Sequence, residues 1–167
     1  MAKFHPLFNP SVMTFSMVVP DMKPSTGIQK ICGFTRGLSF HQVDYFPYWH
    51  ISNSIVLGCN RSSQASWVRL HLYAYVDGKN VQRDLGMFEA GTKLDALMVW
   101  SEIACAIDLQ NSANKSLVST HAVLTGFKTL PVGWMLGNYA EIDNTNNKTP
   151  FHCEVEDLRV NGRVIKI

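Results

Sequence analysis

The chain has 167 residues, of which 46% are hydrophobic and 17% are charged. These values exclude a disordered tail, a collagen-like rod and a polar low-complexity segment, and the length fits one domain. The formal net charge is +2 with the basic residues scattered along the chain, so the sequence predicts no nucleic-acid partner.

The first eleven residues are apolar and interrupted by prolines, and we expect them to form an N-terminal arm (1–11) ahead of a single domain (12–167). Phe4, Leu7 and Phe8 are the large apolar side chains of this arm. An arm of this composition predicts contacts with a neighbouring copy of the chain.

Alternation of apolar and polar residues dominates the chain and predicts β-strands. In the strand from Trp67 to Val76, one face carries Val68, Leu70, Leu72, Ala74 and Val76, and the other carries Trp67, Arg69, His71, Tyr73 and Tyr75. Asp77-Gly78 predicts a hairpin to a strand at Asn80–Leu85. Other strands are expected at 12–19, 28–34, 54–58, 94–100, 103–108, 117–127, 134–139, 151–160 and 164–167.

About nine or ten short strands separated by turn residues predict an all-β fold, either an antiparallel β-sandwich or a jelly roll, with a concanavalin-like arrangement as one option. Thr92–Leu109 also partly fits a period of 3.6, so a helix is the alternative there. The four cysteines, at 32, 59, 105 and 153, are widely spaced, and we expect free and mostly buried thiols. No apolar stretch approaches the roughly 18 residues of a membrane helix, and no membrane partner is expected.

Residues 30–37, Lys-Ile-Cys-Gly-Phe-Thr-Arg-Gly, fit the pattern K-I-x-G-[FI]-[ST]-x-G. Leu136-Gly137-Asn138 and Pro150-Phe151-His152 follow near the end of the chain. These motifs resemble a family of uncharacterised small β-sandwich proteins of Bacteroidetes and their phages. The resemblance implies a phage-associated sandwich that is part of a virion or a surface-binding module, and it supplies no catalytic residues.

Catalytic patterns are incomplete in this sequence. Gly37-Leu-Ser-Phe-His41 has only the first half of a nucleophile elbow, and Gly78-Lys79 lacks the other residues of a P-loop. Glu154 and Glu156, with His152, form the one candidate acid pair for a glycosidase or lyase, although a solvated strand face explains them equally well. We therefore expect a protein that is not an enzyme and needs no cofactor and no metal.

Tyr45, Phe46, Tyr48 and Trp49 surround Pro47, which predicts a loop or an edge strand. These rings are expected to pack in the core, against a neighbouring subunit or on a sugar ring.

The first hypothesis is a bacteriophage virion structural protein, either a capsid decoration or a tail-associated protein, formed in the host cytoplasm and present in the virion. It would act as a homo-oligomer in contact with other virion proteins, through the arm and the residues at 45–49. The alternative is a non-catalytic module that binds host-surface glycans through Trp49, Trp67, Tyr73 and Tyr75.

Overall fold

The computed structural model describes residues 2–4, 10–43, 46–76, 79–101, 103–114, 119–125, 133–136 and 152–166. Twelve strands and no helix occur within these residues, so this part of the chain contains no helix that could cross a membrane. The strands are β1 (Ala2–Phe4), β2 (Ser11–Val18), β3 (Ser25–Val43), β4 (Phe46–Arg61), β5 (Val68–Val76), β6 (Lys79–Phe88), β7 (Lys93–Trp100), β8 (Ala104–Asn111), β9 (Ser119–Thr125), β10 (Gly133–Leu136), β11 (Val155–Val160) and β12 (Arg163–Val164).

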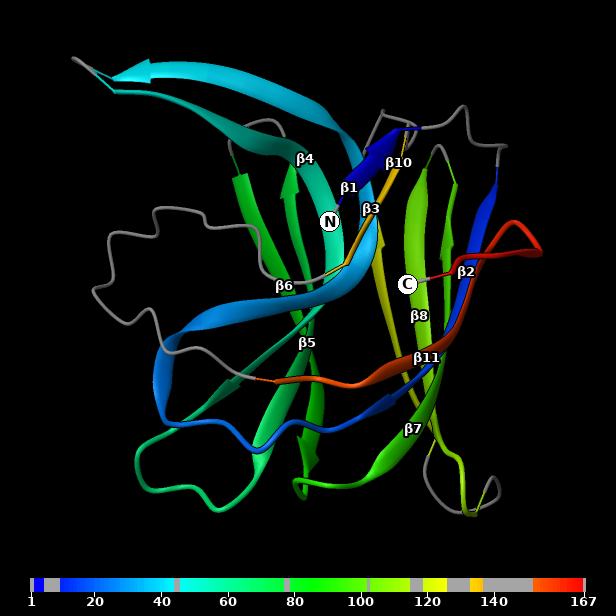
Figure 1. Cartoon of the computed structure of the whole chain (residues 1–167). Coiled ribbons are helices and arrows are strands. Elements are labelled where there is room, and N and C mark those ends of the chain that lie inside the picture. The colour runs from blue at the N-terminus through cyan, green and yellow to red at the C-terminus, as the bar shows by residue number, and fades with distance from the viewer. Residues whose placement is uncertain are drawn as a thin grey trace.

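The strands form two six-stranded antiparallel sheets (Figure 1). Sheet A has the order β1-β10-β3-β4-β5-β6, and sheet B has the order β12-β11-β2-β7-β8-β9. The predicted antiparallel β-sandwich is therefore confirmed, with twelve strands instead of nine or ten. β1 is only three residues long, which leaves no alternating pattern that sequence analysis can detect.

The inward faces of both sheets follow the alternation seen in the sequence. In β7 the buried residues are Leu94, Ala96, Met98 and Trp100, and β8 alternates in the same way, so the helical alternative for this region is wrong. β5 buries Val68, Leu70, Leu72 and Ala74, as predicted. It pairs with β6 up to Val76 and Lys79, on either side of the Asp77-Gly78 position, which lies outside the described residues.

One apolar core joins the two sheets. Phe34 of sheet A packs edge-on against Trp100 of sheet B, with ring centroids 6.0 Å apart, and both rings are fully buried. The Cys32 thiol lies 3.3 Å from the Met13 sulfur across the same interface. All four cysteines are free, as the sequence predicted.

β3 and β4 continue beyond the rest of sheet A as a two-stranded ribbon (Figure 1). β10 pairs with residues 32–35 of β3 and β5 pairs with residues 54–60 of β4, whereas β3 and β4 pair with each other as far as Val43 and Phe46. Pro47 lies in this ribbon, where β4 has β3 as its sole partner among the described strands. The predicted edge position of this proline is therefore confirmed, because an edge strand tolerates a missing N–H donor.

The predicted arm contributes to the fold at both of its ends. Ala2–Phe4 pair with β10 at the edge of sheet A, and Ser11 begins β2. Residues 5–9, which include Leu7 and Phe8, lie outside the described residues.

Candidate functional site

The outward face of sheet A carries the polar side of β5. Arg69, His71 and Tyr73 occupy alternate positions, opposite to the buried apolar residues of the same strand. Asn60 of β4 pairs in register with Arg69, and Gly58 pairs with His71. Because alternate residues of a strand share a face, one strand places a cation, an imidazole and a phenol in one row.

His71 is a buried histidine in the middle of this row, with 5% of its surface exposed. Its Nε2 lies 3.0 Å from Asn60 Oδ1 and donates the hydrogen bond between them, whereas the buried Nδ1 has no hydrogen-bond partner among the described residues. Burial has the largest effect on His71 and lowers its pKa; the negative charge of Asp84 opposes this in part, and the positive charge of Arg69 adds a smaller lowering of the pKa. The ring is therefore a neutral imidazole that fixes the orientation of Asn60.

Tyr73 has a contact at its hydroxyl group and another at one face of its ring. Its hydroxyl donates to Asn80 Oδ1 at 2.9 Å, and Lys30 Nζ lies 5.7 Å from the ring centroid. Lys30 is itself buried. The face of this ring that Lys30 covers is not open for stacking on a sugar, which weakens the prediction for Tyr73.

An open depression of about 530 Å³ lies where β4 ends and β5 begins. We call it the Arg61–Arg69 depression, and Asn60, Arg61, Ser62, Ser63, Arg69 and Met87 are among its lining residues. The connections β2–β3 and β4–β5 meet at this end of the sandwich, opposite to the projecting ribbon (Figure 1). Among the described residues, two guanidinium groups and no carboxylate line it, although each arginine is paired with an aspartate, Asp21 or Asp84, outside the lining.

Backbone and carboxylate oxygens orient the two arginines. Arg61 Nε donates to Ala65 O at 2.9 Å, and its Nη1 donates to Met22 O at 3.0 Å and to Asp21 Oδ1 at 3.1 Å. Arg69 Nη1 forms an ion pair with Asp84. The remaining N–H groups of both guanidinium groups make no hydrogen bond within the described part of the chain, so they are available to a ligand.

Apolar surface flanks these donors. Trp67 is 46% exposed and lies, along the chain, between the lining residues Ala65 and Arg69. Met87, which is 40% exposed, pairs with Arg69 on β6 and lines the same depression. Hydrogen-bond donors together with exposed apolar side chains suit a sugar ring, because a sugar has polar edges and apolar faces.

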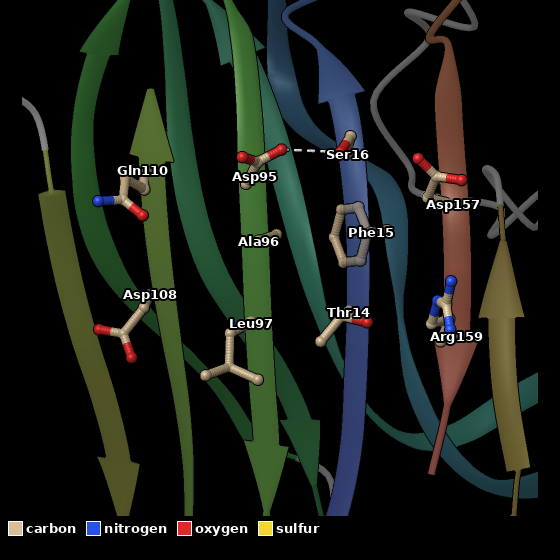
Figure 2. Close-up of a pocket in the computed structure, with 10 residues that line it drawn as sticks. All are labelled: Thr14, Phe15, Ser16, Asp95, Ala96, Leu97, Asp108, Gln110, Asp157 and Arg159. Atoms are coloured by element: carbon tan, nitrogen blue, oxygen red, sulfur yellow. Dashed lines mark hydrogen bonds between the residues drawn. The ribbon is translucent and has the colours of Figure 1, made fainter. Parts of the chain in front are cut away.

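A second, shallower depression of about 360 Å³ lies on the outward face of sheet B (Figure 2). Asp95 Oδ1 accepts hydrogen bonds from Ser16 at 2.7 Å and from Ser112 at 2.9 Å. Figure 2 shows Asp108 and Asp157 on β8 and β11, on either side of the central strands β2 and β7. No group of three or more metal-ligating side chains forms among the described residues.

The predicted acid pair lies outside both depressions. The Glu154 and Glu156 side chains are 61% and 55% exposed, and Lys93 Nζ lies 2.6 Å from Glu156 Oε2. His152 is also exposed, 3.9 Å from Glu154. These carboxylates are solvated and paired, so the geometry gives no support to the glycosidase alternative that rested on them.

The structure places only part of the predicted binding residues. The backbone of five of them is described: Phe4 lies in β1, Tyr75 lies in β5, and the ribbon part of β4 contains Phe46, Tyr48 and Trp49. The structure does not describe the side chains of these five residues. Tyr45 lies outside the described residues, as do Leu7 and Phe8. Sequence analysis missed Asn60 and Arg61. Their position just before the polar Ser62-Ser63 loop was the available signal.

No family model and no curated protein matches the chain. Solved structures share its fold at about 10% sequence identity. The enzymatically active domain of tailspike protein 2 of bacteriophage CBA120 is 10% identical, with a TM-score of 0.59 over 95% of this chain, and the chain spans 23% of its length. A scytalido-glutamic peptidase is 9% identical, with a TM-score of 0.60, covering 98% of this chain and 80% of that one. The CBM2 module of the evolved Dit of Lactobacillus casei BL23 phage J-1 is 9% identical, with a TM-score of 0.50, covering 95% and 66%.

Proposed function

We propose that this chain is a carbohydrate-binding domain of a bacteriophage tail, which recognises glycans of the host surface without catalysis. The observation that carries the proposal is the Arg61–Arg69 depression, which is lined by two guanidinium groups and by the exposed Met87, with the exposed Trp67 two residues before Arg69 in the chain. The fold shared with a tailspike domain and with a CBM module of a phage Dit supports the tail over the capsid as its place in a virion.

The distribution of charges also favours binding over hydrolysis at this site. No carboxylate lines the Arg61–Arg69 depression, and hydrolysis of a glycoside ordinarily uses two. The carboxylates nearest to its arginines, Asp21 and Asp84, are each engaged in an ion pair. The depression is therefore equipped to hold a sugar and lacks a free acid to protonate a leaving group.

A glycan microarray that includes bacterial surface polysaccharides tests the proposal. The full chain should retain at least one polysaccharide, and Trp67→Ala should weaken that binding about tenfold, because stacking on an indole is lost. Ile103→Ala is the matched control, since Ile103 is 74% exposed on the β7–β8 connection. An array without any retained glycan, or Trp67→Ala binding as tightly as the unmodified chain, overturns the proposal.

Subunit contact is a second candidate function, favoured by the ribbon of β3 and β4. Its register pairs Leu38 with Ile51 and Phe40 with Trp49. Alternate pairs of an antiparallel ribbon belong to one face, so four apolar positions share a face beyond the body of sheet A. A two-stranded ribbon is marginally stable alone and gains from a partner, which we propose is another virion subunit or a second copy of the chain.

Light scattering during gel filtration tests this second function. The unmodified chain should be oligomeric, and the double variant Phe40→Thr, Trp49→Thr should be monomeric with an unchanged far-ultraviolet circular dichroism spectrum. A chain that remains monomeric at 100 µM, roughly the range in which weak assemblies form, removes this candidate while leaving glycan binding untouched. Phe4, Leu7 and Phe8 of the N-terminal segment are the next variants to examine if the ribbon variant stays oligomeric.

A further inference from the structure

We infer that the glycan recognised at the Arg61–Arg69 depression is an acidic one, a polysaccharide whose carboxylate binds the two guanidinium groups; this inference rests on the proposed function. Both arginines line the same depression, and no acidic side chain is among its described lining residues. A neutral sugar would need donors and acceptors in similar number, whereas these lining side chains offer mainly donors.

The arginines are held in place in a way that suits anion binding. Arg61 is anchored by two backbone oxygens, Ala65 O and Met22 O, so it stays oriented without depending on a carboxylate alone. Its side chain is 24% exposed, which leaves it reachable but partly desolvated. A carboxylate bound by a fixed, partly desolvated guanidinium makes stronger hydrogen bonds than one bound by a mobile surface group.

Arg69 supplies the adjustable half of the site. It pairs with Asp84, and both side chains are close to half exposed. An incoming carboxylate competes with Asp84 for the same guanidinium group. Asp84 Oδ1 also accepts a hydrogen bond from Gly86 N at 2.7 Å, so Asp84 keeps a structural role after it releases Arg69.

Asn60 completes the site on the side of His71. Its Oδ1 accepts from the buried His71, and Asn60 also lines the depression. The buried histidine therefore fixes an amide group whose Nδ2 carries two further donors.

Isothermal titration calorimetry with polygalacturonate and hyaluronate, each compared with the same polymer after chemical reduction of its carboxyl groups, tests the inference. The full chain should bind at least one carboxylated polymer about tenfold or more tightly than its reduced form. Arg69→Gln should abolish that difference. Asp84→Asn should tighten binding several-fold, because it removes the competing charge and keeps the acceptor for Gly86.

The outcomes separate this inference from the proposed function. Equal binding of a polymer and its reduced form overturns the acidic class and leaves carbohydrate binding standing. Binding to neither polymer, with other glycans retained on the microarray, also overturns the acidic class alone, and no glycan binding in either experiment overturns both. Arg69→Gln and Asp84→Asn should unfold within a few degrees of the unmodified chain. A loss of affinity then reflects binding and not loss of the fold.

Discussion

The buried His71 donates a hydrogen bond through Nε2 to Asn60 Oδ1, across the β4–β5 pair, while its Nδ1 finds no partner in the part of the chain that the structure describes. This bond links the interior of sheet A to the rim of the Arg61–Arg69 depression, because Asn60 lines the depression and His71 does not. The protonation state of a buried side chain thereby bears on both stability and the shape of the site.

Stability should fall in mild acid because of His71. Its folded-state pKa lies below the ordinary value of 6.5, so the unfolded chain takes up a proton first as the pH falls. The contribution of neutral His71 is complete above about pH 6.5 and is lost as the pH falls through its lower folded-state pKa, by up to about 1.4 kcal/mol per pH unit. Urea unfolding from pH 7.5 to pH 5 measures this slope.

The variant His71→Gln should flatten that pH dependence, since glutamine retains a donor for Asn60 and does not titrate. His152→Gln is the matched control, because the His152 side chain is 88% exposed. If the slope is the same in His71→Gln as in the unmodified chain, a different group causes the acid sensitivity.

Truncation of two tryptophans should change the free energy of unfolding by very different amounts. Trp100 is fully buried against Phe34, so Trp100→Ala should lower the free energy of unfolding by about 3–5 kcal/mol through lost burial and a cavity. Trp67 is 46% exposed, and Trp67→Ala should change the free energy of unfolding by less than about 0.5 kcal/mol. Urea unfolding monitored by circular dichroism measures both, and a large loss in Trp67→Ala would place Trp67 in the core instead of at a binding surface.

Two glycines of sheet A should differ in their tolerance of alanine. At Gly33 an added Cβ would overlap the backbone oxygen of Ile55 and lie 2.5 Å from Val56 Cα, so β4 would have to move. At Gly58 the closest obstacle is a side-chain atom, Ile28 Cγ2, and the nearest backbone atom, Gln29 O, is 3.2 Å away. We expect Gly33→Ala to cost about 1–3 kcal/mol and Gly58→Ala less.

Thermal unfolding of both variants and of the double variant Gly58→Ala, Ile28→Ala measures this difference. The double variant should recover the cost of the overlap with Ile28. Equal destabilisation by Gly33→Ala and Gly58→Ala would contradict the distinction between a backbone obstacle and a side-chain obstacle.

The four thiols should be protected while the chain is folded. Burial raises the pKa of Cys32, Cys59 and Cys105 well above their ordinary value and raises that of Cys153 to about 12. At pH 8 a disulfide reagent should react slowly with the native protein, first at the half-buried Cys153, and rapidly at all four positions in denaturant. Peptide mapping identifies the labelled residue, and fast native labelling of Cys32 would mean that the core opens readily.

Local pattern was sufficient for much of the fold. The alternation of Val68, Leu70, Leu72 and Ala74 identified both the strand and its buried face, because side chains of a strand point to opposite sides at every step. The same alternation placed Arg69, His71 and Tyr73 together on the outward face. It left open whether Thr92–Leu109 was helical, and pairing of β7 with β2 and β8 decided that question.

The candidate site depended on contacts that no local pattern encodes. The Arg61–Arg69 depression forms because the β2–β3 and β4–β5 connections meet at one end of the sandwich, which brings Ser25, Arg61 and Met87 to a common rim. His71 reads in sequence as one more polar residue of an outward face, and only its surroundings in sheet A show it buried and bonded to Asn60. The sequence by itself determined most of the longer strands and, in strands such as β5, the inward face, since these follow from the geometry of a single strand. The tertiary structure decided the depression, the partners of its arginines and the reach of the ribbon, since each depends on which distant strands pair and in what register.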